Sequence, residues 1–184
     1  MNFDEICIYV LKEFGESGLQ RAAQQAVADI HLPETSKRYL VDVGLPSERI
    51  LELSLSLKGQ RLPQLAELSP LLACCIVQYP HAHSIGTDTG CAVCVDGSGV
   101  GTIFLVDLTG KDKVRFINSN VEFFGASLAL YHEYCRVGPT VPKQDVDDFI
   151  LKIESRMKDI DPTAIRSPEN WWALILEQMK DGLL

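Results

Sequence analysis

The sequence lacks the features that direct a chain into a membrane or out of the cell. Its first ten residues contain Asp4 and Glu5 and no basic residue, unlike the positively charged start of a secretory signal. Its most apolar run, Leu71–Val77, is far shorter than the roughly 20 residues that span a bilayer. We therefore expect a cytoplasmic protein with no membrane partner.

Basic residues are also scarce. Lys and Arg total 17 against 25 Asp and Glu, which gives a formal net charge of −8. Nucleic-acid binding depends largely on Lys and Arg side chains that contact phosphates, so this charge argues against a nucleic-acid partner. The same charge suits a basic protein partner, because opposite charges attract over long distances.

Nothing in the sequence divides the chain, since it has no internal repeat, low-complexity tract or long linker. Its 184 residues fit the usual length of one domain, and 46% apolar and 23% charged residues are ordinary globular values. We therefore expect one domain over residues 1–184. The six cysteines need not form disulfides in a chain that can bury a core, and we expect most of them to be small buried side chains.

The first 46 residues have the apolar spacing of helices. Within 1–30 we expect two helices, Phe3–Phe14 and Leu19–Val27. A short capped helix is expected within 33–46. There Gly44 suits a left-handed position after the last turn, and the proline that follows two residues later prevents continuation.

Residues 50–118 have the patterns of a β-sheet. In Leu51–Leu57 every odd position is Leu and the even positions are polar, as in a half-buried strand. Short apolar segments separated by turn residues follow, which indicates an antiparallel meander. The expected strands are Ser84–Thr87, Cys91–Asp96, Thr102–Leu108 and Lys113–Ile117, and the last turn is Thr109–Asp112. The run Leu71–Val77 fits either a buried strand or a short buried helix.

Helical patterns return over residues 119–184. Ser119 and Glu122 have the spacing of a capping box that opens the first of these helices. A second apolar stripe covers Lys143–Met157. A last helix is expected to start at Ser167–Glu169 and to turn Trp171, Leu174, Ile175 and Met179 inward. Helices, a meander and helices again predict an α+β fold, with a mainly antiparallel sheet flanked by N-terminal and C-terminal helices.

The pair Cys91 and Cys94 is the most tempting motif for chemistry. With His81 and His83 it could form a zinc site. However, residues three apart on a strand face opposite sides of the sheet, which favours two ordinary strand cysteines. We therefore expect no metal.

Other motifs do not indicate catalysis either. The glycine-rich Gly97–Gly101 leads into a strand, whereas a phosphate-binding loop leads into a helix, so a hairpin is favoured. His132 has no Ser or Cys motif beside it. We expect no catalytic residue and no cofactor.

Several segments together resemble the SUKH superfamily of immunity proteins, which have the Smi/Knr-like fold, and above all its fourth subgroup. Arg38–Pro46 resembles the family's "fL-x-x-vGLP" stretch, and Gly99–Asp107 is similar to its "G-x-V-y-x-l-D" hairpin. Phe116–Phe124 resembles the "fvNsSleqF" junction of strand and helix, with Asn120 where a second Ser is usual. The remaining similar segments are Ile85–Asp88, Cys94–Asp96 and Trp171–Trp172, and the matches run in order over residues 33–182.

The resemblance implies a non-catalytic immunity protein that binds and neutralises a bacterial polymorphic toxin, often a nuclease or a nucleic-acid deaminase. It carries no catalytic residue over to this chain. An intracellular scaffold or regulatory protein-binding module of the same fold is the alternative, and a basic, toxin-like product of the neighbouring gene would favour immunity.

Two acidic groups are candidates for contact with a cationic toxin domain. One lies at the expected strand ends and the other in the first turn of an expected helix: Asp88, Asp96 and Asp107, and then Asp145, Asp147 and Asp148. Carboxylates on an inhibitor would complement the basic surface with which a toxin grips nucleic acid. The alternative is structural, because turns and helix N-termini favour acidic residues in any soluble protein.

Overall fold

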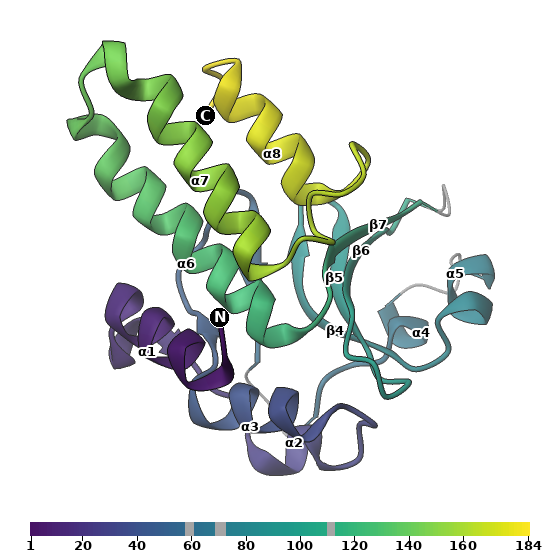
Figure 1. The fold of residues 1–184 in the computed structure, drawn as a ribbon. Helices are drawn as coiled ribbons and strands as arrows, with labels where there is room; N and C mark the ends of the chain where they lie inside the picture. Colours follow the sequence, from purple (N-terminus) through teal and green to yellow (C-terminus); the bar gives the residue numbers. More distant parts are fainter. Residues whose placement is uncertain (58–60, 69–72, 110–112) are drawn as a thin grey trace.

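The computed structural model describes residues 1–57, 61–68, 73–109 and 113–184, and these form an α+β fold (Figure 1). Within the described residues, the main sheet is antiparallel in the order β3-β4-β5-β6-β7, and β1 pairs with β2 separately. The strands are β1 (Leu19–Gln20), β2 (Leu45–Pro46), β3 (Leu53–Leu55), β4 (Ala82–Asp88), β5 (Cys91–Asp96), β6 (Ile103–Asp107) and β7 (Val114–Asn118). The predicted fold class and the predicted meander are confirmed.

The helices lie on both sides of the sheet. They are α1 (Phe3–Phe14), α2 (Gln24–Ala28), α3 (Glu34–Asp42), α4 (Leu65–Leu68), α5 (Ala73–Gln78), α6 (Val121–Val137), α7 (Val146–Ile160) and α8 (Trp171–Lys180). Single 3-10 turns cover Glu16–Gly18, Gly138–Thr140 and Lys143–Asp145. In Figure 1, α6, α7 and α8 cover one face of the sheet and the short α4 and α5 lie on the other.

The sheet therefore separates a large core from a small one. Along β5, Val93 and Val95 are buried in the large core, whereas Ala92 and Cys94 are buried in the small core with Leu65 of α4. This follows from the strand's period of two, which sends successive side chains to opposite faces. Because both faces are covered, the parts of the sheet itself that a partner could reach are its ends and edges.

The N-terminal predictions are confirmed in part. Phe3–Phe14 forms α1 as predicted, with a capping box that starts at Asn2. The predicted helix over Leu19–Val27 is wrong in its first half, where Leu19 and Gln20 pair with β2 before α2 begins. Pairing with a distant segment overrides the local helical pattern here.

Gly44 adopts the predicted left-handed conformation, with a φ of 88°. A side chain at this position would also collide with the main-chain oxygen of Gln20, so the turn that ends α3 requires glycine. This turn sends β2 back against β1, and it thereby brings Gln20 to the edge of the main sheet.

Two C-terminal helix starts differ from the predicted ones by a few residues. The N-cap of α6 is Asn120, whose side chain accepts a hydrogen bond from the Phe123 N–H, and not Ser119. α8 begins at Trp171, because residues 167–170 form turns. Both Trp171 and Trp172 are buried, together with Ile175 and Met179, whereas Leu174, also predicted to turn inward, is only half-buried.

The structure describes part of the apolar run Leu71–Val77, for which the sequence left a strand and a helix as alternatives. Ala73–Gln78 is helical, so the helix alternative is confirmed, but the predicted burial is wrong at Val77, which is exposed. Leu71 and Leu72 lie outside the described residues. Residues 110–112 of the predicted turn Thr109–Asp112 also lie outside them.

Candidate functional site

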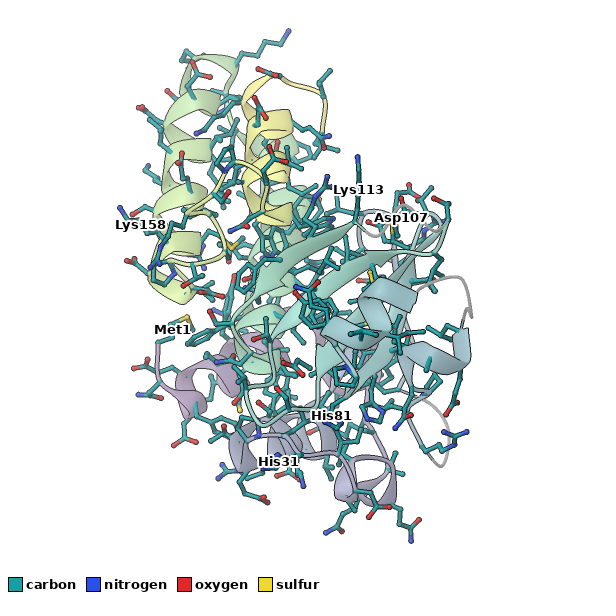
Figure 2. The ribbon with its side chains drawn as sticks, turned by 90° about the vertical axis from the view of Figure 1, so that its right-hand side faces the viewer. Met1, His31, His81, Asp107, Lys113 and Lys158 are labelled. Atoms are coloured by element: carbon teal, nitrogen blue, oxygen red, sulfur yellow. The ribbon has the colours of Figure 1, made fainter. Side chains whose placement is uncertain are left out.

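The sheet brings two of the three predicted strand-end carboxylates together. Cys91 pairs with Asp88 on one side and with Asp107 on the other, so these two acids flank it at one end of the sheet. Asp96 pairs with Ala82 at the opposite end. Figure 2 shows the separation of the two ends, with Asp107 near Lys113 at the upper right and His81 well below them.

Two of these carboxylates also hold turns. Asp96 accepts hydrogen bonds from the Ser98 N–H at 3.0 Å and the Ser98 hydroxyl at 2.7 Å. Asp107 accepts from the Thr109 N–H at 2.8 Å and the Thr109 hydroxyl at 2.6 Å. Both side chains are partly exposed, so each holds a turn while part of it stays at the protein surface.

The second acidic group lies far from the first along the helical layer. Asp145, Asp147 and Asp148 are exposed at the start of α7. In Figure 1 this is the upper left end of the helices, whereas the sheet lies on the right. The two acidic groups therefore form separate patches.

The structure places Cys91 and Cys94 on opposite faces of β5, as the strand geometry predicts. Cys91 packs against the large core and Cys94 lies in the small one, where burial raises the pKa of its thiol to about 12. His81 and His83 instead line a pocket of about 280 Å³ with His31 and Asp29, a grouping that the sequence did not reveal. Among the described residues, no group of three or more His, Cys, Asp or Glu side chains is placed to hold a metal.

His132 takes part in an ionic network that joins α1 to α6. Its Nδ1 lies 2.9 Å from Glu13 Oε1, and Arg136 contacts both oxygens of the same carboxylate at 3.1 Å. Burial opposes ionisation of Glu13, but the hydrogen bonds from Arg136 and His132 outweigh it and lower the pKa of this carboxyl. The network accounts for His132 as a link between helices.

Sequence reasoning missed the surface along β7. Arg115 is exposed and lines two grooves, one of about 420 Å³ beside Asp88 and α8 and one of about 460 Å³ beside Val114 and Phe116. The sequence did contain a signal for this surface. β7 is the last strand of the meander, and the last strand of a meander forms one edge of the sheet. The structure thus adds a sheet edge to the predicted carboxylates.

A family model for SUKH-4 immunity proteins matches residues 10–178, which include the whole sheet and begin within α1 and end within α8. The chain belongs to the SUKH-4 immunity protein family. Searches of curated proteins and of solved structures found no match. No helix in the described part of this SUKH-4 chain is long and apolar enough to cross a membrane.

The junction motif of this SUKH-4 chain has a structural role. Asn118, the last residue of β7, accepts a hydrogen bond from the indole N–H of Trp172 at 2.8 Å and donates to the buried Asp161 at 3.2 Å. Asp161 also accepts from the Ser119 N–H and hydroxyl, at 2.7 and 2.9 Å. The motif therefore fastens β7 to α8 and to the end of α7, and it leaves partner contacts to the surface.

Proposed function

We propose that this SUKH-4 protein neutralises a toxin domain by binding it, without catalysing a reaction. The toxin is a cationic domain that acts on nucleic acid, either a nuclease or a deaminase. The family match carries the toxin-immunity role, and the net charge of −8 supports a cationic partner.

The two acidic patches would act mainly on the rate of association. Asp88 and Asp107 stand together at one end of the sheet, and the three aspartates of α7 stand apart from them. Exposed carboxylates attract a basic domain during diffusion, whereas contacts made after docking set the rate of dissociation. Salt should weaken the attraction, because charges farther apart than about 8 Å are screened at physiological ionic strength.

The test uses the product of the neighbouring gene as the partner and measures association rates at low and at physiological salt. We compare Asp88→Asn with Asp107→Asn, the triple change of Asp145, Asp147 and Asp148 to Asn, and a control with Glu177→Gln and Asp181→Asn. Asn keeps an oxygen for the turn bonds and removes the charge. At least one patch variant should associate roughly threefold more slowly than the control. Association rates that change neither with salt nor with the patch substitutions would contradict the proposed electrostatic attraction.

A titration tests whether the protein acts by binding alone. Inhibition of the toxin should rise in proportion to added protein and be complete at a fixed stoichiometric ratio, since each bound molecule blocks one toxin. Lasting inactivation of a large excess of toxin by a small amount of protein would contradict the non-catalytic proposal.

A further inference from the structure

The β3 edge of the sheet is closed by a side chain. Gln20 donates from its amide nitrogen to the Leu55 carbonyl at 2.8 Å and accepts from the Leu57 N–H at 3.0 Å. The same nitrogen donates to the Pro46 carbonyl at 3.0 Å, and Gln20 is buried. The side chain thereby satisfies main-chain groups that an added strand would need.

The β7 edge carries no such cover in the described part of the chain. The Asp107 N–H donates to the Lys113 carbonyl, and Arg115 pairs with Leu105 two residues farther on. Along an antiparallel strand, the N–H and C=O groups of one residue point to the neighbouring strand and those of the next point away from it. The main-chain groups of Val114 and Phe116 therefore face away from β6. Neither residue's outward main chain has a hydrogen-bond partner among the described residues.

A groove follows this edge. Its lining includes Val114, Arg115 and Phe116 in succession, and successive strand residues point to opposite faces, so the groove runs along the edge and not over one face. Tyr79 and Phe104 contribute two aromatic rings to its lining, tilted to one another with ring centroids 4.5 Å apart. Such a groove offers apolar contact to every second side chain of an extended segment beside β7.

The charges along the edge distinguish between occupants. Lys113 and Arg115 are exposed, and neither forms an ion pair with another described residue. A second copy that paired antiparallel about Val114 or Arg115 would set Arg115 opposite Lys113 or opposite itself. Like charges directly across a strand pair are destabilising, so these two registers of a second copy are disfavoured and a strand with an acidic side chain there is favoured.

Acidic residues surround this basic position. Glu52 and Asp88 line the groove on one side of Arg115, and Glu169 lines the groove on the other. A partner segment that places one acid opposite Arg115 and is flanked by basic residues would match both sets of charges. This pattern fits an extended segment on a domain that is cationic as a whole.

We propose that the β7 edge binds one extended segment of the toxin domain as an added strand of the sheet. The segment places an acidic side chain opposite Arg115 and apolar side chains opposite Val114 and Phe116. The proposal rests on the proposed function and deepens it, because it names the surface and the mode of binding.

The first test removes one outward hydrogen-bond donor. Val114→Pro deletes the N–H that would bond to the added strand and leaves the inward bonds of Lys113 and Arg115 in place. Val114→Thr is the matched control, because it keeps the N–H and the branched shape. Against the product of the neighbouring gene, Val114→Pro should dissociate roughly tenfold faster, and the control should stay within about twofold of wild type.

The second test uses charge, and it remains decisive if Val114→Pro does not fold. Arg115→Glu sets like charges across the added pair, so dissociation should be roughly tenfold faster, with Arg115→Gln in between. The same change adds negative charge, so association with a cationic domain should be unchanged or faster. If only the overall charge mattered, Arg115→Glu would bind the cationic domain more tightly. The added-strand model and general charge attraction therefore predict opposite changes in affinity.

The outcomes separate this proposal from the proposed function. A wild-type protein that does not bind the neighbouring product contradicts the proposed function and removes the basis of the strand model. Binding that persists with unchanged dissociation in Val114→Pro or in Arg115→Glu overturns the β7 edge alone. A dimer of the free protein that Val114→Pro disrupts would assign the edge to a second copy and would also overturn it.

Discussion

The two edges of the sheet are protected from unwanted pairing in different ways. At β3, the buried Gln20 makes hydrogen bonds with main-chain groups. At β7, the main chain of Val114 and Phe116 faces outward, and exposed Lys113 and Arg115 stand on either side of Val114. A side chain that bonds the outward main-chain groups blocks any added strand, whereas exposed charges on an edge disfavour only strands that carry the same charge opposite them. The first device stabilises the fold, and the second leaves a selective surface.

The largest expected effect comes from removing the support of β7. Deletion of Ser167–Leu184 removes α8, including the buried Trp172 that donates to Asn118 at the end of β7. Each large buried side chain contributes about 1.5–3 kcal/mol, and a whole domain is stable by about 5–15 kcal/mol. The truncated protein should be insoluble or molten by thermal unfolding and by NMR. An unchanged thermal midpoint would show that α8 is an independent arm and that the β7 edge does not depend on it.

A smaller effect is expected from a pair of matched substitutions, one at each edge. Gln20→Ala leaves the carbonyls of Pro46 and Leu55 and the N–H of Leu57 without their partner, and each buried unsatisfied group costs about 1–3 kcal/mol. Gln78→Ala removes an exposed glutamine from the groove beside β7 and should change stability by no more than about 0.5 kcal/mol. Urea unfolding measures both. Equal losses of stability would mean that the two edges do not differ as described.

Local signals for the starts and ends of helices and strands made much of the fold predictable. Phe3–Phe14 was predicted at its full length, because its apolar spacing is regular and Gly15 stops it. The half of Leu19–Val27 that became β1 could not be predicted from its own residues, since Gln20 is held by bonds to segments that come 26 and 35 residues later. The start of α6 was displaced by one residue, because Ser119 and Asn120 are both good caps.

More of the candidate site could have been predicted than was. Consecutive strands of a meander run in opposite directions, so Asp88 and Asp107, at the ends of β4 and β6, must share one end of the sheet. Asp96, at the end of β5, must lie at the other. The groove at β7 could not be foreseen, since it needs Tyr79 and Glu169 to meet the strand from distant parts of the chain.

Amide hydrogen exchange at single residues tests the difference between the edges most directly. In the free protein, the N–H groups of Val114 and Phe116 should exchange quickly, while those of Arg115 at the same strand and Leu57 beside Gln20 should exchange slowly. When the product of the neighbouring gene is bound, Val114 and Phe116 should become as slow as Arg115, with no such change at Leu57. Slow exchange of Val114 and Phe116 in the free protein, or continued fast exchange in the complex, would contradict the account.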